Sequence, residues 1–186
     1  LPLVVQFFLA ILVADLAEWA VHFALHKVPF LWRFHSIHHS SQALDWLAGS
    51  RSHFLDDTLV RGFILVPMML FFSQNIILAY LIFVVIHATL SHCNFRPTIK
   101  WLEPFLVVPR YHHWHHSSQR EAIDKNFAIH FPWIDRIFGT YYYPADEWPS
   151  NYGIKGEVIP DGFLRQTYEP FIKPNERLKS AAPSKP

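Results

Sequence analysis

The sequence is poor in the residues on which several common classes of protein depend. Cys93 is the single cysteine, so no disulfide can form within the chain, which fits a reducing compartment. There are only six glycines and no GxGxxG or other nucleotide-binding signature. Charged residues make up 17% and the net charge is +1, and no basic run with interleaved aromatics favours nucleic acid. An HExxH box, typical of zinc hydrolases, is also absent.

Apolar residues are abundant instead. Of the 186 residues, 51% are hydrophobic and 17% aromatic, which suits a membrane protein with a substantial part outside the bilayer. Residues 3–25 can cross a bilayer as a helix of roughly 20 residues. The apolar block 59–90 is interrupted by Pro67 and by Ser73-Gln74-Asn75. As one helix it would exceed the roughly 30 Å hydrocarbon core, so we predict two crossings, at about 59–72 and 76–91.

A hairpin in this block returns the chain to the side from which it came. Basic residues flank the block on both sides: Lys27, Arg33, Arg51, Arg61, Arg96, Lys100, Arg110 and Arg120. By the positive-inside rule both flanks are cytosolic, in a bacterial inner membrane or the endoplasmic reticulum. The chain starts in an apolar run without Met, so we expect upstream membrane helices to be missing.

We therefore predict an all-α integral membrane helical bundle with a cytosolic helical cap over about residues 94–169. Bundle and cap form one domain, residues 1–169. Residues 170–186 contain proline and lysine, and we expect them to be a disordered tail.

Thirteen histidines are present, and most fall into tight clusters. The clusters read HFALH, HSIHH and HHWHH, and residues three and four apart share one face of a helix. One such pair often lies on a solvated face, and the polar stripe that includes Asp15 and Glu18 could instead face neighbouring helices through hydrogen bonds alone. Three clusters offer more ring nitrogens than one four-coordinate ion can use. Two metal ions in a shared site are the natural interpretation.

Neutral imidazole suits iron, zinc and copper, and ligand type does not separate these metals. An apolar substrate in the membrane has C–H bonds and no hydrolysable bond, which favours iron. Ligating rings usually donate their other N–H group to a carboxylate or carbonyl. The sequence leaves open which carboxylates do this among Asp15, Glu18, Asp45, Asp56, Asp57, Glu103 and Asp124.

The order of HFALH, LWRFHSIHHS, RSH, HATLSHCNFR, PRYHHWHH and KNFAIHFPWIDRIFGTYYYP resembles the fatty acid hydroxylase/sterol desaturase superfamily over about residues 11–155. The resemblance implies a non-haem di-iron centre that activates O2, with no catalytic residue beyond its ligands. The ligands it implies are His22, His26, His35, His38, His39, His53, His92, His112, His115 and His116.

Other positions receive supporting roles. His113 and His130 are expected not to be ligands, and the candidates for supporting the ligands are Asp15, Glu18, His87 and Asn126. The resemblance also implies a structural corner with an Asp–Arg pair and a glycine turn, formed by Trp133, Asp135, Arg136 and Gly139.

The function implied is hydroxylation or desaturation of a bilayer lipid with O2, and we favour hydroxylation. Because no nucleotide-binding signature is present, we expect a separate electron donor, a reductase with a ferredoxin or a cytochrome. The expected cofactor is two iron ions, with zinc as a substitute in purified material. The alternatives are a non-enzymatic membrane metal-binding protein and a zinc-dependent membrane hydrolase. The lipid itself is not identified by the sequence.

Overall fold

The computed structural model describes residues 1–97, 99–156 and 159–172. Over these residues the chain is helical and has no strand, and one isolated bridge joins Ser117 to Tyr152. This confirms the all-α prediction. The α-helices are α1 (Leu3–Lys27), α2 (Pro29–His39), α3 (Phe54–Phe71), α4 (Gln74–His92), α5 (Pro109–His115), α6 (Pro132–Phe138) and α7 (Phe163–Tyr168). Short 3-10 helices lie at Ala48–Ser50 (η1), Arg120–Ala122 (η2) and Glu169–Phe171 (η3).

Two helices, α1 and α4, are long and apolar enough to cross a membrane. Their outward faces carry exposed apolar side chains such as Phe8, Ile82 and Val85, which suits contact with lipid. The remaining predicted span, 59–72, corresponds to the C-terminal part of α3. The N-terminal part of this helix carries Asp56 and Asp57. The chain is therefore a membrane helical bundle, as predicted.

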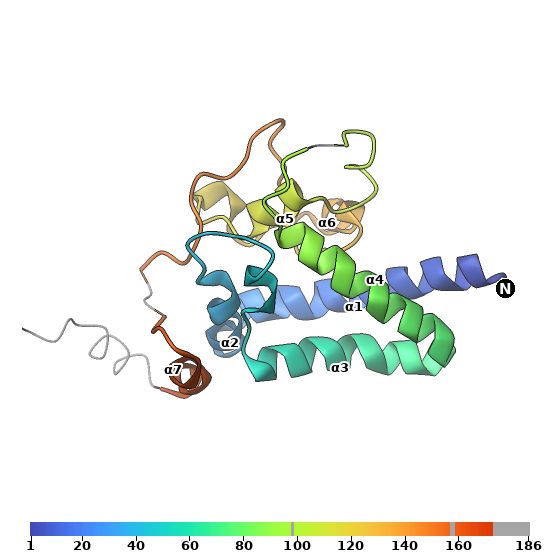
Figure 1. Cartoon of the computed structure of the whole chain (residues 1–186), viewed down its shortest axis with the longest axis horizontal. Helices are drawn as coiled ribbons and strands as arrows, with labels where there is room; N and C mark the ends of the chain where they lie inside the picture. Colours follow the sequence, from blue (N-terminus) through green and yellow to red (C-terminus); the bar gives the residue numbers. More distant parts are fainter. Residues whose placement is uncertain (98, 157–158, 173–186) are drawn as a thin grey trace, which may run out of the picture.

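The bundle is a hairpin of α3 and α4 packed against α1 (Figure 1). The small side chains of Ala10 and Ala14 on α1 are fully buried, and Met68 of α3 and Tyr80 of α4 belong to the same core. Pro67 does not interrupt α3. The reversal falls at Phe72 and Ser73, because Ser73 is extended and Gln74 already starts α4.

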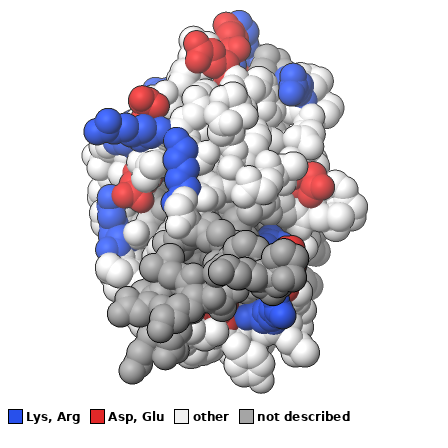
Figure 2. Space-filling model, turned by 90° about the vertical axis from the view of Figure 1, so that its left-hand side faces the viewer, with Lys and Arg blue, Asp and Glu red and all other residues white. Residues whose placement is uncertain are grey.

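The remaining elements gather at the end of the bundle away from the N-terminus, where α1 and α4 finish (Figure 1). Charged side chains of both signs lie on this end (Figure 2). The predicted tail is described only to residue 172, where it completes η3, and residues 173–186 lie outside the described residues.

A segment we call the strap, residues 127–131, fixes this end to α1. Five consecutive backbone N–H groups of the strap donate to two buried carboxylates. Asp135 accepts from Phe127 and Ala128 at 2.9 and 2.8 Å. Asp15 of α1 accepts from the next three residues at 2.6–3.1 Å. A segment that lies outside helix and sheet must satisfy its N–H groups in some other way, and these two carboxylates do so.

Candidate metal centre

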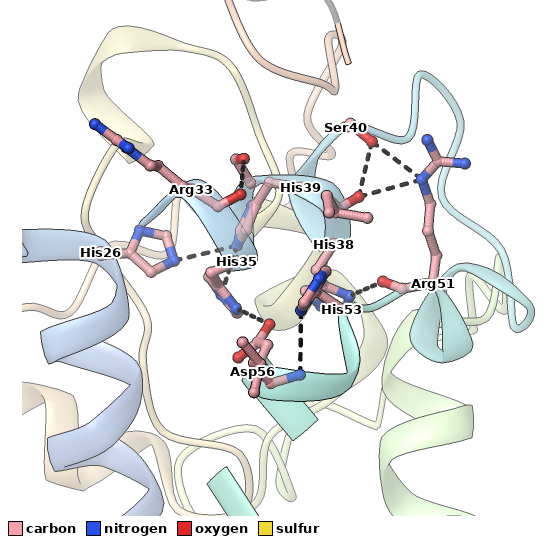
Figure 3. A network of polar contacts seen from close by, with 12 residues as sticks. His26, Arg33, His35, His38, His39, Ser40, Arg51, His53 and Asp56 are labelled. Carbon is pink, nitrogen blue, oxygen red and sulfur yellow. Dashed lines mark hydrogen bonds and ion pairs between the residues drawn. The ribbon is translucent and has the colours of Figure 1, made fainter. Parts of the chain in front are cut away.

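Nine histidines converge in two groups at the end of the bundle where α1, α2, α4 and α5 meet. Within each group one nitrogen of every ring lies within 4.8 Å of the others. The first group is His22, His26, His35, His39 and His115, and the second is His38, His92, His112 and His116. The groups adjoin, because the rings of His39 and His116 stack with centroids 4.4 Å apart. Part of this arrangement, around α2, is shown in Figure 3.

In the first group, hydrogen bonds fix which ring nitrogen carries the proton. The Nδ1 atom of His22 lies 2.9 Å from the Phe127 carbonyl, and that of His115 lies 2.8 Å from the Lys125 carbonyl. A carbonyl oxygen can only accept, so each Nδ1 carries a hydrogen and each Nε2 of the neutral ring is a bare lone pair. The Nε2 atom of His22 is buried and has no hydrogen-bond partner in the described part of the chain. It is placed to bind a cation.

In the second group, backbone carbonyls again hold the Nδ1 protons of two histidines, and here the two Nε2 atoms face each other. Nδ1 of His38 donates to the Arg51 carbonyl at 3.0 Å, and Nδ1 of His92 donates to the Ala88 carbonyl at 2.8 Å. Their Nε2 atoms are 3.5 Å apart, so two lone pairs face each other. His112 brings its own Nε2 within 3.0 Å of that of His92. A metal ion between these atoms would turn a repulsive contact into coordination.

Burial keeps the rings in the form that binds metal. Outside the membrane-spanning helices, removal from water lowers the pKa of His38, His39, His112, His115 and His116 well below 6.5, and the neighbouring histidines lower it further. These rings are neutral at physiological pH. Neutral imidazole is the state that ligates divalent transition metals.

Two carboxylates support the first group. Asp56 of α3 lies 2.8 Å from Nδ1 of His35 (Figure 3), and its other oxygen is buried without a partner in the described residues. Asp124 lies 3.4 Å from Nδ1 of His26 and also pairs with Lys27. A carboxylate behind a ligating histidine orients the ring and offsets the charge of a bound cation. Each of the two groups could therefore hold a transition metal ion.

His53 does not lie in either group, although the RSH pattern predicted it as a ligand. It is the N-cap of α3, where Nδ1 accepts a hydrogen bond from the Leu55 N–H at 3.1 Å. Nε2 lies 3.0 Å from the Thr167 carbonyl of α7 and donates to it. Both nitrogens are occupied in holding α3 and α7, so the geometry does not support a ligand role.

Three of the four residues expected to support the ligands have other partners. Asp15 holds the strap, and His87 lies 2.8 Å from His130 and 2.9 Å from the Val107 carbonyl. Asn126 accepts from the Tyr142 N–H and donates to the Tyr111 and Tyr142 carbonyls. Glu18 has a buried carboxylate oxygen without a partner in the described residues. Backbone carbonyls, Asp56 and Asp124 take the supporting positions instead.

His113 and His130, expected not to be ligands, lie outside both groups. His113 contacts the Tyr152 hydroxyl at 2.7 Å and the Cys93 carbonyl at 3.1 Å.

The corner around α6 differs from its prediction in one respect. Asp135 forms no Asp–Arg pair within the described residues. Its partners are the Trp19 indole, the Tyr111 and Thr140 hydroxyls and the strap. Arg136 turns outward, donates to the Tyr141 hydroxyl and stacks on that ring. Gly139 ends α6 with φ of 73°, and Trp133 stacks on Phe131.

Gly49 also borders the site, and no sequence pattern indicates it. This residue of η1 faces the ring of His92, and a Cβ atom there would lie 3.0 Å from Nδ1 of that histidine. The absence of a side chain lets η1 approach the second group closely.

A membrane helical bundle that gathers nine histidines at one end, seven of them buried, defines a membrane protein able to bind metal. The sequence profile named fatty acid hydroxylase matches residues 7–140, and the chain belongs to the fatty acid hydroxylase family.

Similar proteins are lipid-modifying enzymes. Ornithine lipid hydroxylase OlsE of Rhizobium tropici is 28% identical over 92% of this chain and 52% of its own length. Human alkylglycerol monooxygenase is 29% identical over 71% of this chain and 29% of its own length. A very-long-chain aldehyde decarbonylase of Oryza sativa subsp. japonica is 25% identical over 68% of this chain and 21% of its own length. The chain thus spans about half of the first of these relatives and less of the others. No solved structure matches it.

Proposed function

We propose that this chain is a membrane-bound di-iron oxygenase that hydroxylates a lipid with O2 and electrons from a separate donor. The observation that carries the proposal is the convergence of histidine ring nitrogens, in groups of five and four, at the end of two membrane helices. Imidazole nitrogens, with no carboxylate among the described members of either group, suit iron as well as zinc and copper. The lipid hydroxylase and monooxygenase among the relatives support the same class of reaction.

The residues of the chain hold and orient the site. When bound, two iron ions would supply activation of O2 and removal of a hydrogen atom from a C–H bond. The carbonyls of Phe127, Lys125 and Arg51 keep their histidines in one tautomer, so each Nε2 stays available. The Phe127 ring packs against His22 and His26 with centroids 5.5 and 5.0 Å apart, which keeps water from this side of the ligands.

Hydroxylation consumes one O2, two electrons and two protons for each C–H bond converted to C–OH, and releases one water. The chain has no nucleotide-binding signature, and we propose that the electrons come from a separate donor, a reductase with a ferredoxin or cytochrome. Desaturation needs the same inputs and releases two waters. We favour hydroxylation.

We also propose that the histidine end lies on the cytosolic side, as the basic flanks of the α3–α4 hairpin suggest. Single cysteines at Ser52 and Lys100, in a Cys93→Ser background, should be labelled from the same face of sealed vesicles. Labelling from opposite faces would contradict one shared site.

The test of the reaction uses the purified chain, reconstituted with iron, a reductase and its ferredoxin. We expect close to two irons per chain and incorporation of ¹⁸O from labelled O2 into a lipid, with no turnover on NAD(P)H alone. A new double bond without label would indicate desaturation. Oxidation without O2, or full activity in a preparation that holds only zinc, would eliminate the oxygenase. A metal carrier would bind metal but oxidise nothing, and its ligands are expected to be exposed, whereas most of these are buried.

A further inference from the structure

The depth of the histidine groups in the membrane limits which part of a lipid can reach them. Helix α4 has 19 residues, so it is about 28 Å long, close to the roughly 30 Å of the hydrocarbon core. It starts at the polar residues Gln74 and Asn75 and ends at His92, a member of the second group. The groups therefore lie at the boundary between hydrocarbon and headgroups. The ends of lipid tails lie about 15 Å away, at the middle of the bilayer.

A cavity of about 310 Å³ opens beside both groups. His26, His39 and His115 of the first group line it together with His116 of the second, so a molecule bound there reaches both proposed metal positions. The volume is at the small end of the roughly 300–1,000 Å³ typical of ligand sites. The cavity can therefore take one end of a lipid, not its whole length.

Its other walls combine apolar and polar groups. Trp32 and Ile154 provide apolar surface, whereas the hydroxyls of Ser117 and Ser118 and the carboxylate of Asp124 can hydrogen-bond a ligand. Lys155 is exposed at the cavity and makes no ion pair within the described residues. Asp124, by contrast, is already engaged by Lys27 and lies near His26. Lys155 is thus the group at this cavity best placed to meet an anion from the solvent side.

We propose that the cavity binds the polar end of a membrane lipid, with an anionic group of that end, a carboxylate or a phosphate, on Lys155. The carbon oxidised then lies in the polar end or in the first few carbons next to it. This inference rests on the proposed oxygenase function and adds to it the substrate class and the position of attack. The reaction balance is unchanged: the C–H bond becomes C–OH, one oxygen atom leaves as water, and the separate donor supplies both electrons.

Binding is tested on the purified chain without turnover. It is equilibrated with mixed micelles that hold equal amounts of three lipids with identical tails: phosphatidylglycerol, a diacylglyceryl lipid with a carboxylate headgroup, and neutral diacylglycerol. Mass spectrometry then measures the lipid retained. In Lys155→Glu we expect the ratio of retained anionic to neutral lipid to be about threefold to tenfold lower than in the unmodified chain. In Lys155→Arg the ratio should stay within about twofold of that of the unmodified chain. The two anionic lipids show whether phosphate or carboxylate is preferred.

Lys100→Glu is the matched control, because Lys100 is exposed, pairs with Asp146 and does not line the cavity. It changes the net charge by the same amount, so an effect common to both variants would reflect the general field of the protein and overturn the site. An unchanged ratio in Lys155→Glu would overturn it as well.

The position of attack is tested with ¹⁸O2 and fragmentation of the product lipid. Label in the headgroup or the first few carbons supports the inference, and label in the distal half of a tail overturns it while leaving the oxygenase intact. If no lipid gains label or a new double bond although retention depends on Lys155, the proposed oxygenase function fails and the binding site stands.

Discussion

His22 of α1 and Phe127 of the strap are joined by a hydrogen bond of 2.9 Å from the ring Nδ1 to the backbone carbonyl. This contact connects the metal centre to a segment that has no sheet or helix of its own to hold it. The strap is instead held by Asp15 and Asp135, whose carboxylates accept all five of its N–H groups. The position of a proposed ligand thus depends on two carboxylates that belong to neither histidine group.

Replacing Asp135 with Asn should therefore weaken both fold and site. An amide keeps one acceptor oxygen but places an NH2 group among the donors of Trp19, Tyr111 and Thr140. We expect the free energy of unfolding to fall by about 2–4 kcal/mol, with a lower metal content. Thermal unfolding in detergent and elemental analysis would measure these changes.

Asp146→Asn is the control for that substitution. Asp146 is 68% exposed and pairs with Lys100 and with Arg110, which also donates to Glu103, so its loss should cost at most about 1 kcal/mol. Equal stability of the two variants would show that the strap does not depend on Asp135.

The last histidine box offers a direct test of the ligand assignment. His116→Ala removes one of four nitrogens from the second group, so we expect bound metal to fall from about two ions per chain to about one. His113→Ala should leave the metal content near normal, because that ring contacts Tyr152 and Cys93 instead. Elemental analysis of the two purified variants separates these outcomes. Metal loss in His113→Ala alone would mean that the register of this box is wrong.

The apolar segments predicted the helical bundle, and helical spacing predicted eight of the nine histidines that the structure brings together, because residues three or four apart share a helix face whatever the rest of the fold does. The ninth, His92, was predicted from the resemblance to the superfamily. His53 has no such local partner, and its ring is directed by the start of α3 and by α7. Spacing along the chain also could not predict which carboxylates contact the ligand rings. Asp124 reaches His26 across about half of the chain, and the α6 corner forms around Trp19 instead of Arg136.

Gly49 tests how closely η1 must approach the second group. A methyl group there would lie 3.0 Å from a ring that is already held by the Ala88 carbonyl, so His92 would have to move by a few tenths of an ångström. We expect Gly49→Ala to lower metal content, mainly in the second group, with little change in helix content. Gly62→Ala is the control, because nothing lies within 4 Å of the added methyl in α3. It should keep the metal and gain about 0.5–1 kcal/mol from helix propensity. Equal metal content in the two variants would contradict a steric role for Gly49.

The stability of the metal-free chain should fall as the pH drops below 6.5. Burial, followed by the charge of His87, lowers the pKa of His130 to about 3. Between about pH 3 and 6.5 the unfolded state therefore binds a proton at this residue that the folded state does not. The contribution is fully present above pH 6.5 and is lost as the pH falls, by about 1.4 kcal/mol per pH unit for each such histidine. Burial lowers the pKa of His113 to about 4, which adds a second contribution of the same sign.

His130→Gln removes the first of these contributions, so its unfolding midpoint should depend less steeply on pH than that of the unmodified chain between pH 6.5 and 4.5. The comparison uses slopes, because the substitution also changes stability at neutral pH. Gly62→Ala adds no titrating group and should keep the original slope. Thermal unfolding of the three chelator-treated proteins at several pH values measures these slopes. If the unfolding midpoint of the unmodified chain stayed constant or rose as the pH was lowered from 6.5 to 4.5, His130 and His113 would not be held neutral by burial.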